Sequence, residues 1–261
     1  MELKGFGKYL TFGLRKNWVD VFFQNTENWL SSNSLGNKQV DSVIAWLKDA
    51  EILKNVNKKG MKIDLTNIGK KLAQLYNSNE NFVWKIIWIN LSYNSDLVKW
   101  YISLPWRHTY SKTELLELLM ENGLKKNTAD SGLGSLFNMF ENSPLGNEFK
   151  IGVITRKNKE RYVEKIGTYE IEIETALYSL YKYAEESNRY DLTVSELYDE
   201  KNPHGIYKEF GVSKTEFEKI LRSLQENYSN LVNADLKANL DNIHLNKNLN
   251  INELINKVRM L

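Results

Sequence analysis

The sequence contains no cysteine, and it has only three histidines and three prolines among its 261 residues. The lack of cysteine excludes disulfides, thiolate metal sites and cysteine nucleophiles. The histidines, His108, His204 and His244, are too scattered for a zinc-ligand pattern, so we predict no metal site built from protein ligands. No apolar run approaches the roughly 18 residues of a membrane span, and the N-terminus has no apolar signal region. We therefore expect a cytoplasmic protein.

The charge is distributed unevenly along the chain, although its total is only +2. Residues 1–76 carry 12 Lys/Arg and 7 Asp/Glu, a net charge of +5. Residues 77–168 carry 12 and 10, a net +2, and residues 169–261 carry 11 and 16, a net −5. This asymmetry favours a basic part that faces double-stranded DNA and an acidic part that faces a partner protein.

The glycines near the start, Gly5 and Gly7 followed by Lys8, resemble a phosphate-binding loop. Such a loop needs a strand before the first glycine and a Ser or Thr after the lysine, so that amides and lysine converge on the phosphates. Only four residues precede Gly5, and Tyr9 follows Lys8. We conclude that this stretch is not a phosphate loop.

Residues 16–76 show the order helix, helix, hairpin. Apolar residues recur at helical spacing over 15–30 and over 34–50. Two short β-prone runs then flank Asn57-Lys58-Lys59-Gly60, a good hairpin turn, and Thr66 can cap the helix that follows. This order is that of a winged helix-turn-helix.

The same order is predicted twice more, over residues 111–168 and 193–246. Ser111-Lys112-Thr113-Glu114 fits a capping box at the start of one helix, and Asn127 or Thr128 is the expected cap of the next. The helices between these units are rich in aromatic residues, and the stretch 82–106 is apolar on nearly every face, which predicts a buried helix pair.

The predicted fold is therefore mainly α, with winged helix-turn-helix-like units and short β-hairpin wings around a central aromatic-rich helix pair. We expect an N-terminal unit over 1–76, the central helices and a second unit over 77–168, and an acidic unit over 169–261. No disordered linker is evident, so we expect the three units to pack as one body.

Candidate DNA contacts follow from this fold. In winged helices the second helix of the helix-turn-helix enters the major groove and the hairpin touches the backbone or minor groove. Basic side chains at hairpin tips neutralise phosphates and give affinity without sequence choice. The predicted contacts are Lys38, Gln39 and Ser42 on the helix, Lys58, Lys59 and Lys62 on the first wing, and Arg156, Lys157, Lys159 and Arg161 on the second.

Candidate catalytic residues are harder to assign. A magnesium-dependent nuclease needs carboxylates that hold the ion beside the scissile phosphate. Asp235-Leu236-Lys237 and Glu148-Phe149-Lys150 fit the acid-x-Lys pattern, but neither has an upstream acidic partner. The cluster Trp106-Arg107-His108 could face a phosphate, or it could cap the central helices. The catalytic residues stay unassigned.

Short motifs in a fixed order carry a resemblance over the first two-thirds of the chain. They begin with Phe12, Leu14, Arg15 and Trp18, and continue with Leu35-Gly36, Lys38, Val40 and Trp46, then Leu65-Thr66 with Gly69, and the helix 88–91. These motifs resemble the SspB-like family, bacterial proteins with a domain of unknown function that accompany DNA phosphorothioation genes. Arg15, Trp18 and Lys38 match the family signature. The family's Gly-His-Glu-Thr-Phe run lacks its His and Glu here, so no catalytic residue is carried over.

The resemblance implies a DNA-binding component of a bacterial DNA phosphorothioation or defence system. SspB-type members are described as magnesium-dependent DNA nickases, which would make Mg²⁺ a cofactor; no other cofactor is evident. Related domains occur beside or fused to proteins similar to phosphoadenosine phosphosulfate reductases, so a non-catalytic accessory domain of such a sulfur-transfer enzyme is an alternative. A transcription regulator is a third. Whether the protein is an enzyme stays open.

Overall fold

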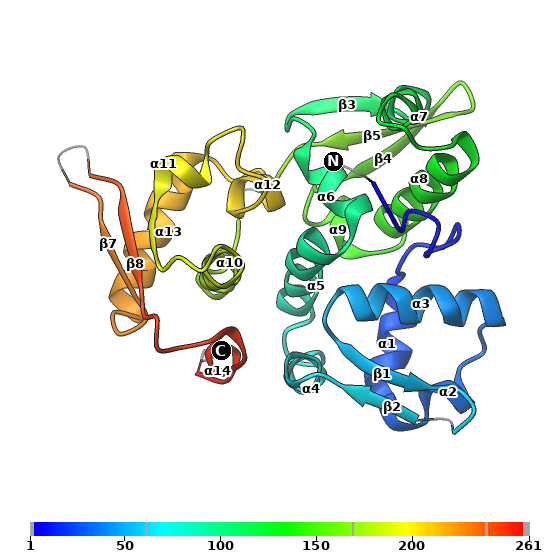
Figure 1. Ribbon diagram of the computed structural model, residues 1–261, viewed down its shortest axis with the longest axis horizontal. Helices are drawn as coiled ribbons and strands as arrows, with labels where there is room; N and C mark the ends of the chain where they lie inside the picture. Colours follow the sequence, from blue (N-terminus) through cyan, green and yellow to red (C-terminus); the bar gives the residue numbers. More distant parts are fainter. Residues whose placement is uncertain (1–2, 61, 169, 238–239, 258–261) are drawn as a thin grey trace. The chain divides into compact units, whose positions relative to one another are not determined.

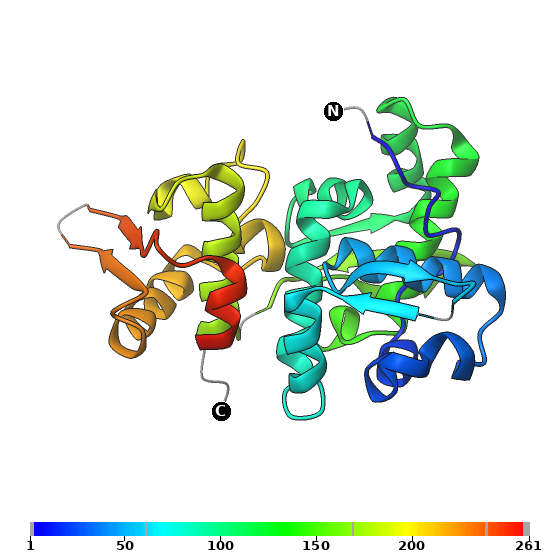
Figure 2. The ribbon, with the colours of Figure 1, turned by 60° about the horizontal axis from the view of Figure 1, so that its bottom comes forward.

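The computed structural model describes residues 3–60, 62–168, 170–237 and 240–257. The chain divides into two compact units, one ending at Gly167 and the other beginning at Thr168 (Figures 1 and 2). The second unit corresponds within one residue to the predicted acidic segment 169–261, whereas the predicted segments 1–76 and 77–168 are parts of one unit. The structure is mainly helical with small antiparallel sheets, as predicted. In the described residues no helix is both long enough and apolar enough to span a bilayer.

The first part of the first unit is built from helices followed by a hairpin. The hairpin strands β1 (Leu53–Asn57) and β2 (Lys62–Leu65) pair antiparallel, with Asn57 opposite Lys62. Thr66 caps the next helix as predicted, because its hydroxyl accepts a hydrogen bond of 2.8 Å from the amide of Gly69. The helices are α1 (Lys16–Gln24), η1 (Thr26–Asn28), α2 (Trp29–Ser32), α3 (Asn37–Asp49) and α4 (Asn67–Leu75).

The central helices α5 (Glu80–Asn94) and α6 (Asp96–Ser103) form the core of the first unit. Their apolar composition predicts burial, and Trp88 and Trp100 are indeed buried, which confirms that expectation. The Trp88 ring lies 6.2 Å from the ring of Tyr101 and 5.8 Å from that of Phe140, measured between centroids. Ser95 separates the two helices and caps α6 by accepting a hydrogen bond from the Val98 amide.

The second part of the first unit contains a three-stranded sheet in the order β3-β5-β4. Ser111 and Glu114 form the predicted capping box at the start of α7. The expected cap of α8 was wrong, because the helix begins at Lys126 with Lys125 before it and no side chain caps it. The elements are β3 (His108–Ser111), α7 (Lys112–Glu121), α8 (Lys126–Glu141), α9 (Pro144–Asn147), β4 (Val153–Lys157) and β5 (Glu160–Lys165).

The second unit repeats this sheet pattern with the order β6-β8-β7. The elements between residues 194 and 245 lie within the predicted unit 193–246, whereas the strand β6 and the helix α14 were not predicted. The elements are α10 (Ile173–Ser187), β6 (Asp191–Thr193), α11 (Val194–Leu197), α12 (Ile206–Phe210), α13 (Lys214–Asn227), β7 (Val232–Asp235), β8 (Asn242–Leu245) and α14 (Ile251–Lys257).

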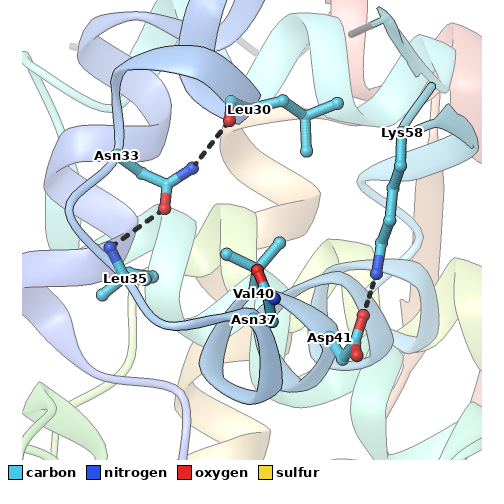
Figure 3. Close-up of a pocket in the computed structure, with 7 residues that line it drawn as sticks. All are labelled: Leu30, Asn33, Leu35, Asn37, Val40, Asp41 and Lys58. Carbon is cyan, nitrogen blue, oxygen red and sulfur yellow. Dashed lines mark hydrogen bonds and ion pairs between the residues drawn. The ribbon is translucent and has the colours of Figure 1, made fainter. Parts of the chain in front are cut away.

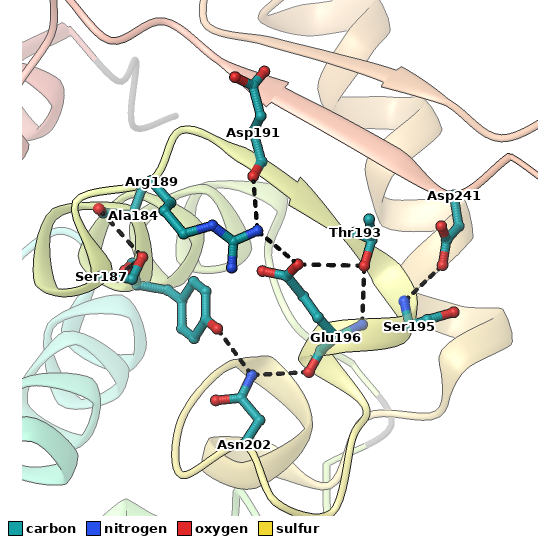
Figure 4. A network of polar contacts seen from close by, with 10 residues as sticks. Ala184, Ser187, Arg189, Asp191, Thr193, Ser195, Glu196, Asn202 and Asp241 are labelled. Carbon is teal, nitrogen blue, oxygen red and sulfur yellow. Dashed lines mark hydrogen bonds and ion pairs between the residues drawn. The ribbon is translucent and has the colours of Figure 1, made fainter.

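A polar network in the second unit joins α10, β6, α11 and Asp241, the residue before β8 (Figure 4). Arg189 donates 3.0 Å to the carboxylate of Glu196 and also reaches the backbone carbonyl of Asp191. Asp241 accepts a 2.7 Å hydrogen bond from the Ser195 amide, and the hydrogen bonds from Ser195 lower the pKa of Asp241. These contacts satisfy the first turn of α11, which is too short to hold its position alone. The network is structural.

A carboxyl group is buried inside the second unit. The side chain of Glu209, on α12, is fully buried, and Ser179 on α10 donates a 2.6 Å hydrogen bond to it. Burial raises the pKa of Glu209 to about 7, although Ser179, the Gly205 amide and Lys182 act in the opposite direction.

This burial predicts a pH dependence of stability. The folded state keeps a proton on Glu209 up to about pH 7, whereas the unfolded chain loses it near its ordinary pKa of 4.5. The stabilising contribution is therefore complete below pH 4.5 and is lost as the pH rises toward 7, by about 3 kcal/mol in total. Glu209→Gln should remove this loss, so its stability relative to the parent should increase between pH 5 and pH 8. Hydrogen exchange of peptides from α10 and α12 measures this difference in stability between the variant and the parent.

The control is Glu226→Gln, a change of an exposed acid on α13 in the same unit. Water solvates this side chain in the folded and unfolded states, so the variant should follow the parent at every pH. A Glu209→Gln protein with the parent's pH profile would contradict the assignment.

Candidate nucleic-acid interface

The first helix–hairpin, defined as α3 with strands β1 and β2, is held together at its exposed edge. Gln39 accepts a 3.0 Å hydrogen bond from the Gly36 amide and so fixes the start of α3. At the other side, Lys58 at the hairpin tip forms an ion pair with Asp41 on the second turn of α3 (Figure 3). The tip of the hairpin therefore lies beside the N-terminal half of the helix.

The predicted basic contacts of this helix–hairpin are exposed. Lys38 lies on the first turn of α3, and Lys59 and Lys62 lie on the hairpin. Within the described part of the chain these three lysines have no ion-pair partner, and we call them the three free lysines. With Lys58 they place four positive charges around one edge, where they can reach the phosphates of a nucleic acid.

Two helix positions predicted to touch DNA differ from expectation. The prediction for Ser42 was wrong: its side chain is fully buried and donates to the carbonyls of Tyr9 and Phe12, at 2.9 and 3.0 Å. Gln39 is half-buried and uses its side-chain oxygen for the cap of α3. The exposed positions at the start of the helix are instead Asn37, Lys38 and Asp41.

The N-terminal segment, residues 5–14, explains the burial of Ser42, because it lies between α3 and α8 (Figure 1). On the α3 side, Tyr9 stacks on Trp46 with ring centroids 3.5 Å apart. On the α8 side, Asn138 donates 2.8 Å to the carbonyl of Thr11. The Gly5-Phe6-Gly7-Lys8 stretch is thus part of a structural connection and not a phosphate loop.

The second helix–hairpin, α8 with strands β4 and β5, is assembled differently. Its tip, Asn158 and Lys159, has positive φ at both residues, which is the type I′ geometry of a two-residue turn. Arg156 lies 2.9 Å from the Glu141 carboxylate, and Arg161 lies 3.7 Å from it and over the Phe137 ring. Because Glu141 is in the last turn of α8, this hairpin lies beside the C-terminal end of its helix.

The two hairpins therefore differ in how their basic residues are paired and in which end of the helix lies beside them. Arg156 and Arg161 share one carboxylate, whereas Lys157 and Lys159 are exposed and have no ion-pair partner in the described residues. The two hairpins also lie at opposite ends of the first unit (Figure 1). Only the first hairpin has its tip beside the start of its helix, which is the end that reads base edges in helix-turn-helix proteins.

A pocket of about 490 Å³ lies between the α2–α3 loop, the first half of α3 and the tip of the first hairpin (Figure 3). Its apolar side chains are Leu30, Leu35 and Val40, all half-buried. Its polar side chains are Asn33, Asn37, Asp41 and Lys58. The sequence did not predict this pocket, because its lining comes from three separate elements.

The structure places the acid-x-Lys motifs away from any metal-binding arrangement. Glu148 follows α9 and is exposed, and Asp235 ends strand β7. In the described ranges no group of three or more His, Asp or Glu side chains could hold a metal ion. These two motifs do not fit a preformed Mg²⁺ site.

The side chains of the cluster Trp106-Arg107-His108 do not share one surface, because Trp106 is buried and the other two are exposed. Trp106 is buried under the ammonium of Lys165, which lies 4.4 Å from its ring. The amide of Arg107 donates 2.6 Å to the Lys165 carbonyl, and His108 is exposed on β3 against the Tyr110 ring. This arrangement fits the alternative that the segment caps the central helices.

No protein-family model matches the chain, and no curated protein does. Two solved structures of SspB match it. The structure of magnesium-bound SspB has a TM-score of 0.72 at 11% sequence identity, over 93% of this chain and 83% of the SspB chain. A second SspB structure has a TM-score of 0.67 at 10% identity, with the same coverage. This chain has the SspB fold.

The predicted resemblance to SspB-like proteins is thereby confirmed at the level of the fold. Within the SspB fold the signature residues have separate roles. The guanidinium of Arg15 lies 4.7 Å from the ring of the buried Trp18, so this pair packs the start of α1 against the core. Lys38 is exposed at the start of α3 and is one of the three free lysines.

The contact between the N-terminal segment and α8 gives a test of this arrangement. A Cβ atom at Gly13 would lie 2.1 Å from the Met139 amide nitrogen and 2.5 Å from the Ser135 carbonyl oxygen. Both are backbone atoms of α8 and cannot yield locally, so Gly13→Ala should destabilise the first unit by about 2–3 kcal/mol or more. Urea unfolding followed by tryptophan fluorescence measures this unit, because all seven tryptophans precede Gly167.

Gly7→Ala is the matched control in the same segment. A Cβ atom at Gly7 would meet nothing within 4 Å, so this variant should unfold at the parent's urea concentration. Equal midpoints for the two variants would show that the segment does not pack against α8 in solution.

Proposed function

We propose that this protein is a DNA-binding component of a bacterial DNA phosphorothioation or related defence system, and that its first helix–hairpin contacts the duplex. The observation that carries the proposal is the position of the hairpin tip beside the first half of α3, where Lys58 forms an ion pair with Asp41. The order of helices and strands in this region, α3 followed by β1 and β2, supports a winged helix-turn-helix. In that motif the start of the second helix faces the major groove and the hairpin contacts the neighbouring backbone.

The charges and exposed side chains support different roles for the two elements, with phosphate contacts from the lysines and base contacts from the start of α3. The three free lysines and Lys58 can neutralise phosphates, which gives affinity for any sequence. Asn37 and Lys38, exposed on the first turn of α3, are the side chains that would meet base edges. The second helix–hairpin presents Lys157 and Lys159 but not the start of α8, so it adds backbone contacts only.

Two observations support a role in a phosphorothioation system. The chain has the fold of SspB, and the motifs of its N-terminal two-thirds resemble proteins that accompany phosphorothioation genes. The proposal stops at binding. Within the described residues no group of three or more His, Asp or Glu side chains could hold a metal ion, and the catalytic residues stay unassigned. A nicking assay on supercoiled plasmid with Mg²⁺ separates a binding protein from a nickase.

The acidic second unit suits a different partner. Residues 169–261 carry a net charge of −5, which opposes close approach to DNA and favours a basic protein surface. We assign this unit to docking of a protein of the same system. Binding assays with the purified products of neighbouring genes, across a salt series, test the assignment, and the absence of any salt-sensitive complex would oppose it.

The DNA contact is tested by removing pairs of lysines. Lys59→Ala with Lys62→Ala should weaken binding to every duplex similarly and flatten the plot of log affinity against log salt by about two units, because about 0.9 units are lost with each phosphate contact. Thermal stability should barely change, since exposed lysines contribute little to folding. The measurement is binding of labelled duplex across a salt series.

Two variants with the same charge change serve as controls. Lys157→Ala with Lys159→Ala measures the second hairpin separately and should flatten the slope by no more than about two units, because only phosphate contacts are proposed there. Lys70→Ala with Lys247→Ala, at exposed positions on neither hairpin of the first unit, should keep the parent's slope. A parent without DNA affinity at low salt, or equal slopes in all variants, would exclude the first hairpin as a DNA surface.

A further inference from the structure

The pocket beside the first hairpin has the chemistry of a site for a flat, partly polar ring. Its volume of about 490 Å³ lies within the range of roughly 300–1,000 Å³ typical of small-ligand sites. Leu30, Leu35 and Val40 supply apolar walls, and none of the described residues that line the pocket is aromatic. A ring that enters this pocket therefore packs against aliphatic groups only.

The polar groups of the pocket lie on two sides of it, with Asn33 on one side and Asp41 and Lys58 on the other (Figure 3). Asn33 is occupied, since its amide nitrogen donates to the Trp29 and Leu30 carbonyls and its oxygen accepts from the Leu35 amide. The Asn37 side chain forms no hydrogen bond within the described ranges, and Asp41 contacts Lys58 through one carboxylate oxygen. An amide and a carboxylate oxygen thus remain to donate to and accept from the edge of a ligand.

The charge around the pocket identifies the class of ligand. Lys58 lines it, Lys38 follows Asn37, and Lys59 and Lys62 lie on the same hairpin. A ring with hydrogen-bonding edges that is attached to negative charge on both sides is a nucleotide within a nucleic-acid strand. The charge complementarity favours this ligand over an apolar side chain of a partner protein.

We propose that this pocket receives a single unpaired nucleobase of DNA bound along the first helix–hairpin. A base in an intact duplex is stacked and paired, so only a bulged, mismatched or single-stranded nucleotide can turn into the pocket, and such nucleotides cost the least to extrude. Asp41 can accept a hydrogen bond from an exocyclic amino group, which favours adenine, cytosine or guanine over thymine. The inference rests on the proposed DNA contact and extends it to the form of DNA that binds best.

The experiment compares a fully paired duplex with the same duplex carrying one bulged 2-aminopurine. The parent should bind the bulged duplex about fivefold more tightly, the gain expected from burying roughly 40 Å² of apolar ring surface against aliphatic walls at about 25 cal/mol per Å². The fluorescence of 2-aminopurine, which is quenched by stacking in DNA, should rise on binding because the pocket has no aromatic side chain. Both readings come from one titration.

Val40→Phe should fill the pocket and abolish both the preference for the bulge and the rise in fluorescence. Val21→Phe is the matched control, since Val21 is 42% exposed on α1 and does not line the pocket. Asn37→Ala, at an exposed position, removes a polar contact without altering the core, and it should lower the preference for the bulge even if Val40→Phe disturbs folding.

The outcomes separate this inference from the proposed function. Equal affinity of the parent for paired and bulged duplexes overturns the nucleobase site and leaves the DNA contact standing. A preference for the bulge that survives both pocket variants also overturns it, because the preference then arises elsewhere. A parent that binds neither duplex at low salt overturns both proposals.

Discussion

The contact that the first unit depends on is the N-terminal segment between α3 and α8. Ser42 donates to two carbonyls of the segment, and Trp46 stacks on Tyr9 and also donates 2.9 Å to the carbonyl of Phe12. On the opposite side Gly13 lies against the backbone of α8 so closely that no larger residue fits. One segment built from consecutive turns therefore joins two helices that are about ninety residues apart in sequence.

This contact decides which surfaces of the two helices remain free. On α3 the segment covers the face with Ser42 and Trp46 and leaves the opposite stripe from Asn37 and Lys38 to Asp41 exposed. On α8 it covers the middle of the helix around Ser135 and Asn138. The first helix–hairpin keeps an open helix start beside its hairpin, and the second does not.

Much of the fold follows from the sequence because its signals are local. Helical spacing of apolar residues, the capping residues Thr66 and Ser111, and the turn at Asn57–Gly60 identify helices and hairpins without tertiary information. Burial of the helix pair around Trp88 follows from its composition. The exposed lysines of both hairpins follow from their position at turns.

The remaining features arise from contacts between distant residues. Spacing within α3 places Ser42 opposite the apolar face, and nothing nearby in sequence shows that residues 9 and 12 will cover it. Strand β3 is only four residues long and is recognisable mainly through its pairing with β5. The pocket has a lining drawn from α2, α3 and the hairpin, so its composition becomes apparent only when these elements are brought together.

The ion pair between Asp41 and Lys58 affects how many phosphate contacts the salt dependence of binding reveals. In the free protein the ammonium of Lys58 already has a carboxylate neighbour, and both side chains are about half exposed. When a phosphate takes that place, the nucleic acid releases a condensed cation, and the carboxylate left behind attracts one from solution. In the proposed complex the two effects oppose each other, so Lys58 would contribute little to the salt dependence even where it contacts a phosphate. Counterion release measured for this surface therefore gives a lower bound on its phosphate contacts.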